Sequence, residues 1–406
     1  MKILVVGSGG REHALAWALD RTGVNTVLVS PGNPGTATFA LNVSTPSDPL
    51  QAAVDHGVDL VVVGPEAPLA AGLGDRLRAA GIPCFGPGAR CAALEGSKWF
   101  AKEVMAAAGV PTASGEIFDN SGDALAFMNG KPSDWVLKAD GLAAGKGVVL
   151  PDTLLEAREA LEGLLSNPPG RVVVEERLSG PEVSVMAVCS GTEAVILPPS
   201  RDHKRLGEGD TGPNTGGMGA VCPPGGLPEG FSSIMERTVF KPVLRELEGR
   251  GLDYRGVLYA GMMLTPGGPR VLEFNVRVGD PETQAVLPLL DGDLAGLLMA
   301  AALGRKLPEP RVLPGASAVV ILASAGYPGE YRKGAVITGL DNVGDAMVFH
   351  AGTSLAGGEI VTSGGRVLGV AASGEDLSQA LEKVYGAVDS IRFDGLTCRR
   401  DIGRVL

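Results

Sequence analysis

The stretch Val271-Leu272-Glu273-Phe274-Asn275-Val276-Arg277-Val278-Gly279-Asp280-Pro281-Glu282 indicates a β-strand that runs into a polar turn. Because side chains alternate between the two faces of a strand, we expect an apolar face and a polar face. The apolar face would hold Leu272, Phe274 and Val276, and the polar face Glu273, Asn275 and Arg277. Carboxylate and amide oxygens suit Mg²⁺ bound to nucleotide phosphates, and a neighbouring arginine suits a carboxylate or phosphate. The alternative is an edge strand whose charged side chains are simply solvated.

The composition is that of a folded protein with several domains. The chain has 406 residues, of which 45% are hydrophobic and 20% charged, and this length allows about two to four domains. The 60 glycines and 29 prolines indicate many tight turns and ligand-facing loops. A formal net charge of -11 argues against a general nucleic-acid-binding surface.

Export and membrane signals are not expected in this chain. Residues 1–7 predict a buried strand and not a signal peptide, and no run of about 18 apolar residues occurs. The 5 cysteines are odd in number and show no Cys-x-x-Cys spacing, which is typical of buried, reduced thiols. We therefore expect a cytoplasmic protein with neither a nucleic-acid nor a membrane partner.

The amino-terminal part predicts a parallel α/β domain. Residues 2–30 read as a strand, a glycine turn, a helix and a second strand, in which glycines let a phosphate approach the helix amino terminus. NAD binding is disfavoured, because Glu12 stands where the dinucleotide fingerprint needs glycine or alanine. The second strand also ends in Ser30 and not in the acid that binds ribose. A phosphate site for another ligand is the better interpretation.

Two lysines stand where they could bind phosphate. Ser97 is a good cap for the next helix, which places Lys98 in its first turn. Lys138 precedes the glycine-rich residues 141–147, which lie between two apolar strands. The backbone N–H groups of such a loop are open to phosphate oxygens. A glycine-rich turn without a ligand remains the alternative.

The next segments offer groups for a nucleotide and a second ligand. A buried strand ending near Glu175 leads through a polar link to another strand, and such a link can read an adenine edge. Glu175 would accept from the adenine amino group and Glu182 from the ribose hydroxyls. Residues 201–219, rich in donors and glycines, predict a long loop without regular structure, which is usually functional.

Taken together, these stretches resemble the ATP-grasp superfamily and, within it, the glycinamide ribonucleotide synthetase family. The resemblance covers essentially the whole chain. It rests on the segments Gly7–Ala14, Ser97–Lys98, Lys138–Gly147, Arg201–Arg205, Asn214–Gly219 and Glu273–Thr283. The most specific part is Arg-Asp-His-Lys-Arg at 201–205 followed by Asn-Thr-Gly-Gly-Met-Gly at 214–219.

The resemblance implies a monomeric ligase of de novo purine biosynthesis that joins glycine to 5-phosphoribosylamine through glycyl phosphate, with ATP as co-substrate. Mg²⁺ or Mn²⁺ would be held by Glu273 and Asn275. The nucleotide would be bound by Lys98, Lys138, Gly141, Gly145, Lys146, Gly147, Glu175, Glu176, Leu178 and Glu182. The other substrates would be bound by Gly9, Gly10, Arg201, Asp202, Asn214, Gly216 and Arg277. Catalytic roles would fall to Arg277, which would grip the glycine carboxylate, and to Lys138 and Asp202.

The expected architecture is multidomain, α/β and α+β. A parallel α/β domain at 1–96 precedes a two-lobed ATP-grasp core at 97–315, with a mobile lid at about 118–186. Short strands and one helix at 375–388 indicate a small α+β domain at 316–406.

Three alternatives remain. A carboxyaminoimidazole ribonucleotide synthetase would share the nucleotide lobes but lack the segments 201–205 and 214–219. An NAD-dependent oxidoreductase would rest on the first strand–helix–strand unit alone. A nucleotide-binding module without catalysis is opposed by the two lysines, the metal pair and Arg277.

Overall fold

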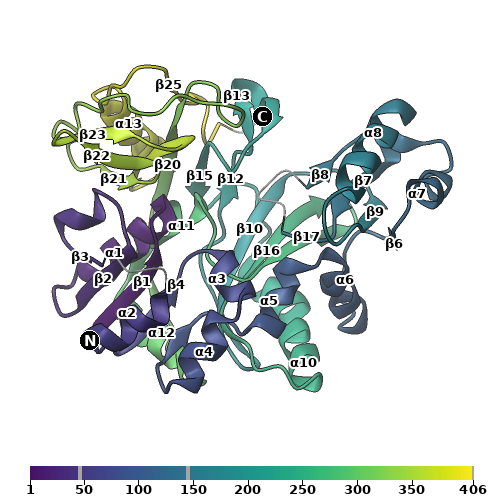
Figure 1. Cartoon of the computed structure of the whole chain (residues 1–406), viewed down its shortest axis with the longest axis horizontal. Helices are drawn as coiled ribbons and strands as arrows, with labels where there is room; N and C mark the ends of the chain where they lie inside the picture. The colour runs from purple at the N-terminus through teal and green to yellow at the C-terminus, as the bar shows by residue number, and fades with distance from the viewer. Residues whose placement is uncertain (44–47, 143–146, 405–406) are drawn as a thin grey trace.

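The computed structural model describes residues 1–43, 48–142 and 147–404, and its amino-terminal domain is built on a parallel sheet (Figure 1). The five strands stand in the order β3-β2-β1-β4-β5. They are β1 (Lys2–Gly7), β2 (Thr26–Pro31), β3 (Leu41–Asn42), β4 (Leu60–Val63) and β5 (Cys84–Phe85). The centres of β1, β2 and β4 are continuous buried runs of valine, leucine and isoleucine, as expected for a parallel sheet covered on both faces. The predicted α/β domain is confirmed.

The helices of this domain are α1 (Gly10–Asp20), α2 (Pro49–His56), α3 (Glu66–Ala70), α4 (Leu73–Ala79) and α5 (Ala89–Gly96). The helices α1 to α4 connect the parallel strands, and α5 follows the last strand. The strand order reverses between β1 and β4, which makes this position a topological switch point. Ligands of open α/β sheets bind at such a point, outside the carboxyl ends of the strands. The turn before α1 and the segment that leads from β4 to α3 meet there.

The central sheet is antiparallel and carries the opening stretch of sequence. Its order is β11-β10-β16-β17, with β10 (Glu182–Ser190), β11 (Glu193–Ile196), β16 (Arg255–Thr265) and β17 (Gly268–Asn275). The prediction for Leu272 was wrong, because this side chain is half-buried while Val271 is completely buried. The pairing of β16 with β17 shifts between Gly261 and Met262, and such a bulge adds one residue and breaks the alternation of faces.

A small lobe projects from the body of the molecule (Figure 1). It consists of the sheet β6-β9-β7-β8 and two helices: β6 (Gly115–Phe118), α7 (Ser121–Phe127), β7 (Trp135–Ala139), β8 (Val148–Val149), α8 (Leu154–Leu165) and β9 (Val172–Glu176). The predicted strands on either side of the glycine-rich segment are confirmed as the antiparallel pair β7 and β8. The lobe has a hydrophobic core separate from the others, with Leu137, Leu161 and Val174 at its centre.

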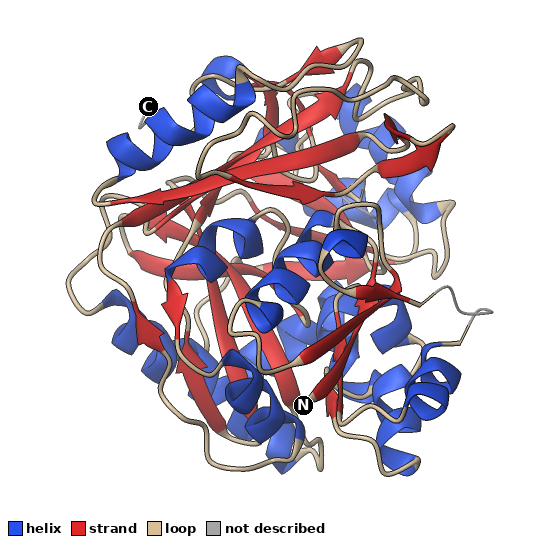
Figure 2. Ribbon diagram, turned by 90° about the vertical axis from the view of Figure 1, so that its left-hand side faces the viewer, coloured by secondary structure: helices blue, strands red, loops and turns tan. Residues whose placement is uncertain are grey.

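The carboxy-terminal domain takes two strands from the preceding part of the chain. Its sheet runs β12-β15-β20-β24-β21, with β25 beside β20, and α13 packs against β20 and β24 (Figure 2). The strands are β12 (Arg201–Asp202), β15 (Gly219–Cys222), β20 (Ala316–Ser324), β21 (Met347–His350), β24 (Arg366–Gly374) and β25 (Leu396–Thr397), and the helix α13 is Leu377–Val388. The predicted small α+β domain is therefore confirmed.

The prediction that residues 201–219 lack regular structure was wrong. Besides β12 and the start of β15, the segment contains the hairpin of β13 (Arg205–Gly207) and β14 (Thr211–Asn214). β15 pairs with β20, nearly a hundred positions further along the chain, and local sequence carries no signal for so distant a partner.

Further helices and strands lie outside these sheets. They are α6 (Lys98–Ala107), α9 (Phe231–Met235), α10 (Lys241–Gly249), α11 (Glu282–Val286), α12 (Leu294–Ala302), β18 (Leu290–Asp291), β19 (Arg311–Val312), β22 (Thr353–Ala356) and β23 (Glu359–Thr362). All five cysteines are free thiols and four are buried, as expected. Across the described ranges, no helix combines the length and the apolar character that a membrane span requires.

Two buried histidines join the amino-terminal and carboxy-terminal domains. The backbone N–H of His350 donates to Nδ1 of His13 at 2.9 Å, and Nδ1 of His350 lies 3.1 Å from Oγ1 of Thr353. Burial, with a contribution from His350, lowers the pKa of His13 to about 3. Burial lowers the pKa of His350 to about 4. Both rings are therefore neutral in the folded protein at neutral pH.

This interface should lose stability in mild acid. The unfolded chain binds protons at these histidines below about pH 6.5, whereas the folded chain does not, so stability falls as the pH is lowered. Between pH 7 and pH 5 each histidine should contribute a loss of about 2 kcal/mol. His13→Asn keeps an acceptor but cannot be protonated, so its thermal midpoint should fall less between these pH values than that of the wild type. Equal falls would contradict this assignment.

Candidate active site

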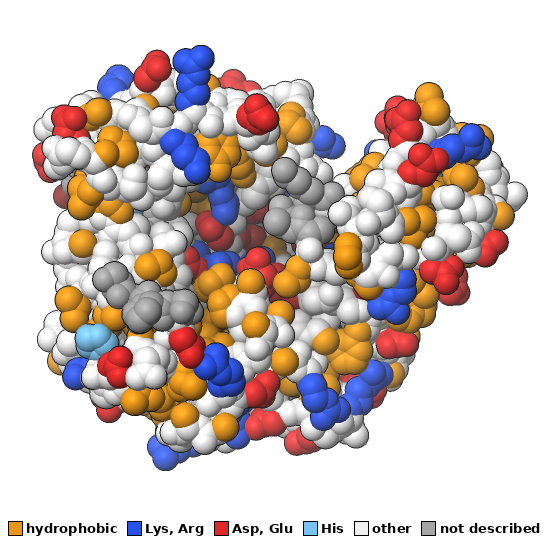
Figure 3. Space-filling model, viewed as in Figure 1, with side chains coloured by type: hydrophobic (Ala, Val, Ile, Leu, Met, Phe, Trp, Pro, Cys, Tyr) orange, Lys and Arg blue, Asp and Glu red, His pale blue; other side chains and the backbone are white. Residues whose placement is uncertain are grey.

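A hollow lies between the two terminal domains and the small lobe, and acidic and basic side chains gather in it (Figure 3). The predicted site residues of β17 stand on the polar face of that strand. Phe274 and Val276 are in the core, whereas Glu273, Asn275 and Arg277 are half-buried, so the predicted alternation holds from Glu273 onward. Burial by itself would raise the pKa of Glu273. Four cations, Lys204, Lys138, Lys98 and Arg277, outweigh burial and lower it. The carboxylate is thus ionised.

These four cations come from separate parts of the chain. Lys98 begins α6, Lys138 lies on β7, Lys204 follows β12 and Arg277 follows β17. The structure therefore places Lys98 and Lys138, the predicted phosphate lysines, where their charges act on Glu273, the predicted metal ligand. Lys204 was not singled out beforehand, although it stands inside the specific segment 201–205. Cations gathered around one carboxylate provide charge for phosphate groups.

Arg277 is held by two carboxylates of the amino-terminal domain. Its Nη2 lies 3.0 Å from Oε1 of Glu95, and its Nε lies 3.4 Å from Oε2 of Glu66. The other oxygen of Glu95 accepts from the backbone N–H of Val276 at 2.8 Å. Burial raises the pKa of Glu95, and its net shift is upward although Arg277 opposes it. The pKa of Arg277 is also raised, because the carboxylates outweigh its burial.

Glu95 and Glu66 were missed by sequence reasoning. Glu66 follows β4, and this position at the carboxyl end of a parallel strand was a usable signal. Glu95 lies inside the last turn of α5, where a charged residue is ordinarily solvated. Its importance follows from tertiary packing, which buries 93% of it beside β17 and leaves only 7% exposed.

In the small lobe, a buried carboxylate binds two lysines. Oε2 of Glu175 lies 2.7 Å from Nζ of Lys102, and Oε1 forms an ion pair with Lys138. Nζ of Lys138 also donates to the carbonyl of Leu272 at 2.8 Å, and Nζ of Lys102 donates to the carbonyl of Ala113 at 2.7 Å. These contacts connect β7 and β9 of the small lobe to α6 and β17 below it.

The beginning of the glycine-rich segment is fixed to the helix that carries Lys98. Oδ1 of Asp140 accepts from Oγ of Ser97 at 2.8 Å and from the backbone N–H of Trp99 at 3.1 Å. Ser97 also caps α6 by accepting from the N–H of Phe100, so the predicted cap is confirmed. Nη2 of Arg171 lies 2.6 Å from Oδ2 of Asp140. Asp140 was not predicted, although it stands beside the glycines.

The remaining nucleotide candidates follow the small lobe into the central sheet. Gly141 and Gly147 flank the gap in the described residues, and Gly145 and Lys146 lie outside them. Glu176 ends β9 and forms an ion pair of 3.5 Å with Arg270, and Leu178 lies in the link to β10. Glu182 begins β10, and its Oε2 lies 2.6 Å from Nζ of Lys204.

A second group of buried polar residues lies beside the 201–219 segment. Oε1 of Glu282 accepts from Oγ of Ser184 at 3.0 Å and from the hydroxyl of Tyr259 at 2.9 Å. Burial raises the pKa of Asp202 well above its usual value, and the charge of Glu282 raises it further. Oδ1 of Asp202 is buried without a partner among the described residues. Asp202 is therefore suited to hold a proton.

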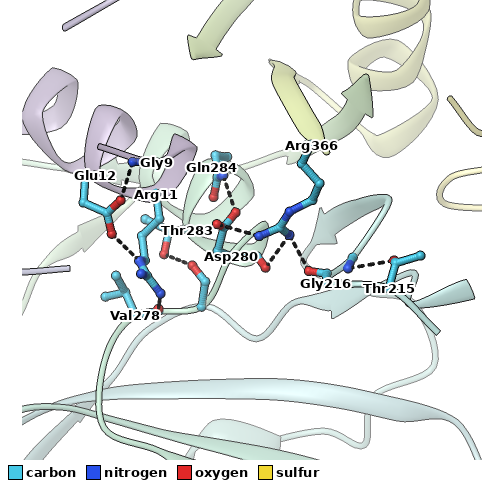
Figure 4. A network of polar contacts seen from close by, with 12 residues as sticks. Gly9, Arg11, Glu12, Thr215, Gly216, Val278, Asp280, Thr283, Gln284 and Arg366 are labelled. Carbon is cyan, nitrogen blue, oxygen red and sulfur yellow. Dashed lines mark hydrogen bonds and ion pairs between the residues drawn. The ribbon is translucent and has the colours of Figure 1, made fainter. Parts of the chain in front are cut away.

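The predicted substrate residues of the amino terminus and the 201–219 segment are linked by a polar network (Figure 4). The N–H of Gly9 donates to Oε2 of Glu12 at 2.7 Å. The residue that stands in place of the third fingerprint glycine thus binds the backbone of the turn. A Cβ on Gly10 would lie 2.9 Å from Nε2 of Gln284. Gly216 accepts from Arg366. Asn214, at the exposed end of β14, lies outside this network, and Nε of Arg201 donates to the carbonyl of Glu182 at 3.1 Å.

The fold and the site define an ATP-grasp enzyme. Family models for phosphoribosylglycinamide synthetase match three consecutive parts of the chain: the N domain at residues 1–95, the ATP-grasp (A) domain at 96–283 and the C domain at 317–405. The chain belongs to the phosphoribosylglycinamide synthetase family.

Relatives match along nearly the whole chain. The phosphoribosylamine–glycine ligase of Synechocystis is 48% identical over 99% of each chain, and that of Rhodopirellula baltica is 47% identical over 98% of this chain and 96% of its own. The crystal structure of the phosphoribosylamine–glycine ligase of Thermotoga maritima is 36% identical, with a TM-score of 0.88 over 99% of this chain and all of the other. The N5-carboxyaminoimidazole ribonucleotide synthetase of Thermotoga maritima is only 16% identical, with a TM-score of 0.65 over 97% and 99%, which shows a shared fold alone.

The two lysines at Glu175 should contribute to stability. Lys102→Met leaves Oε2 of Glu175 without its ion pair and the carbonyl of Ala113 without its donor, and an unpaired buried polar group costs about 1–3 kcal/mol. Denaturant titration should show a loss of this size, whereas Lys131→Met, at an exposed lysine of the small lobe, should change little. The double variant Lys102→Met/Glu175→Gln should be more stable than the sum of the two losses predicts. Additive losses would argue against the coupling.

Proposed function

We propose that this protein joins glycine to 5-phosphoribosylamine at the expense of ATP, giving glycinamide ribonucleotide, ADP and phosphate in de novo purine biosynthesis. The observation that carries the proposal is the full-length similarity to proteins named phosphoribosylamine–glycine ligase. The carboxyaminoimidazole ribonucleotide synthetase alternative is much weaker, because its representative is far less similar in sequence.

For ATP, the proposal assigns the phosphates to Lys98, Lys138 and the glycine-rich segment 141–147. Both lysines contribute positive charge at Glu273, which supports a shared phosphate position. Glu175, Glu176, Leu178 and Glu182 follow one another along the link from β9 to β10, and we assign adenine and ribose to this link. We further infer that the small lobe is the core of the mobile lid, since its separate hydrophobic core would let it move as a unit.

The donor set of β17 fits a hard divalent cation. Glu273 offers an ionised carboxylate and Asn275 an amide oxygen, and both are ligand types that Mg²⁺ and Mn²⁺ accept. Among the described residues, no three histidines, cysteines or acids group together to form a complete protein cage, so phosphate and water oxygens would complete the coordination. The ion would supply positive charge against the phosphates. Oδ1 of Asn275 also accepts from Nη2 of Arg277 at 3.3 Å, which orients the amide oxygen.

For glycine, the proposal uses Arg277. Its guanidinium would bind the carboxylate near the γ-phosphate, so that a carboxylate oxygen can attack the γ-phosphorus. The bond from this phosphorus to the β,γ-bridging oxygen breaks, ADP leaves, and glycyl phosphate is formed. A phosphate leaves from the glycyl carbon far more easily than oxide would. Because Glu95 fixes one side of the guanidinium, Arg277 is already oriented before the substrate arrives, which lowers the entropy cost of the reaction.

For phosphoribosylamine, the proposal uses the 201–219 segment and the turn at Gly9 and Gly10. The amine attacks the glycyl carbonyl, phosphate departs, and the amine nitrogen loses a proton. Asp202, whose pKa is raised by burial, is the proposed acceptor of that proton. No covalent bond to the protein is needed. A monomer in the cytoplasm is also part of the proposal, and the free thiols support the cytoplasmic location alone.

The substrate requirement tests the proposal directly. Phosphate release should need ATP, Mg²⁺, glycine and freshly prepared phosphoribosylamine together, and omission of any one should abolish it. Alanine should replace glycine poorly, because the added methyl group costs about 1–3 kcal/mol in a close-fitting pocket. Equal turnover with alanine and glycine would refute the assignment.

Glu273→Gln tests the proposed metal ligand. The side chain keeps its size on a half-buried face, so the folded state should lose less than about 1 kcal/mol. Loss of the charge should reduce turnover by a factor of about 10²–10³, or roughly 3–4 kcal/mol of barrier. Asn275→Ala should act in the same direction but less strongly. Raised Mg²⁺ should restore part of the activity, and near-normal turnover at ordinary Mg²⁺ would contradict the assignment.

A further inference from the structure

Arg366 extends from the carboxy-terminal domain into the network beside the predicted phosphoribosylamine residues (Figure 4). It begins β24, and its Nη2 lies 2.7 Å from Oδ2 of Asp280. Its Nη1 donates to the carbonyl of Asp280 at 2.9 Å and also to the carbonyl of Gly216. One planar guanidinium therefore fixes the main chain of two segments that come from different parts of the sequence.

Asp280 is held from both sides. While Oδ2 binds Arg366, Oδ1 accepts from Nε2 of Gln284 at 2.8 Å. An ionised carboxylate can only accept, so this bond requires the amide to present its NH₂ group to Asp280. Burial alone would raise the pKa of Asp280, but Arg366 and Arg11 together with the Gln284 bond hold it below its usual value. Both oxygens are thus engaged, which suits Asp280 to fix its turn and not to bind a ligand itself.

Gly216 is fixed by the same domain. Its N–H donates to the hydroxyl of Tyr327 at 2.9 Å. A Cβ at this position would lie 3.1 Å from Cζ of Arg366 and 3.2 Å from the Tyr327 hydroxyl, so a side chain here would disturb both contacts. On the other side of the network, Gln284 packs against Gly10 at the start of α1. The segment at Gly216, the turn at Asp280 and the turn at Gly10 therefore form one continuous wall.

We propose that Arg366 is a positioning residue for phosphoribosylamine, a role that rests on the proposed function. It holds Gly216 and Asp280 in place so that this wall fits the sugar-amine substrate. The nucleotide end of the site depends on other residues, because the cations that act on Glu273 are Lys204, Lys138, Lys98 and Arg277. Loss of Arg366 should consequently affect one substrate more than the other two.

Steady-state kinetics of three variants test this role. Arg366→Met should raise the KM for phosphoribosylamine by about tenfold or more, the effect expected when a substrate-aligning contact is lost. The KM values for ATP and glycine should change less than about twofold. Arg366→Lys keeps the charge but lacks the fork that reaches three acceptors, so its effect should be intermediate. Tyr327→Phe removes only the bond to Gly216 and should raise the same KM more weakly.

The controls separate this role from a general loss of structure. Arg332→Met alters an exposed arginine of the same domain and should leave all three KM values unchanged. An unaltered KM for phosphoribosylamine in both Arg366→Met and Tyr327→Phe would overturn the inference. A parallel rise of all three KM values in both variants would overturn it as well. Failure of the wild-type protein to turn over with all substrates present would instead refute the proposed function.

Discussion

The ion pair between Arg277 and Glu95 is the contact on which the arrangement of the site depends. It fastens the end of β17 to the amino-terminal domain, since Glu95 also accepts from the N–H of Val276. A few residues later, Asp280 fastens the same chain segment to the carboxy-terminal domain through Arg366. Removing one partner of a buried pair leaves an uncompensated charge and is far more costly than the pair is stabilising. The segment that follows Glu273 is therefore attached to both the amino-terminal and the carboxy-terminal domain.

The charges of the site are distributed in a way that suits an anionic ligand. Glu273 remains ionised among lysines and an arginine, while Glu175 balances Lys102 and Lys138. Arg277 in turn is balanced by Glu95 and Glu66. Each cation thus has a carboxylate nearby in the folded chain, which lowers the cost of burying it. Phosphates and a divalent cation can then enter without forcing the fold to carry a large net charge.

Local patterns predicted those features that depend on neighbouring residues. These features are the alternation from Glu273 to Arg277, the cap at Ser97 and the antiparallel pairing of β7 with β8. Leu272 was misplaced because a bulge depends on the partner strand. Residues 201–219 were misjudged in part because β12 pairs with β15, and β15 in turn pairs with β20, which follows much later in the chain.

The residues that sequence reasoning missed share one property. Glu95, Asp140 and Arg366 all act across the boundary between two units of structure, and each has an ordinary local setting: a helix end, a strand end and a strand start. Their roles appear only when a distant partner is known, since a charged residue with no visible partner is ordinarily solvated. For Arg366, the glycine at 216 was a local hint, because glycine permits the close approach of a neighbouring group.

The contacts beneath the small lobe explain how lid movement and nucleotide binding could be coupled. Lys138 reaches the carbonyl of Leu272 on β17, Glu175 reaches Lys102 on α6, and Asp140 reaches the first turn of α6. These links are polar, whereas the hydrophobic core of the lobe is separate from the others. An ion pair or hydrogen bond of this kind can be replaced by one to a ligand at little net cost in free energy, because one charge-assisted bond takes the place of another. A phosphate that binds Lys138 would therefore alter a contact that holds the lobe in place, and the proposed closure of the lid would then depend on the ligand itself.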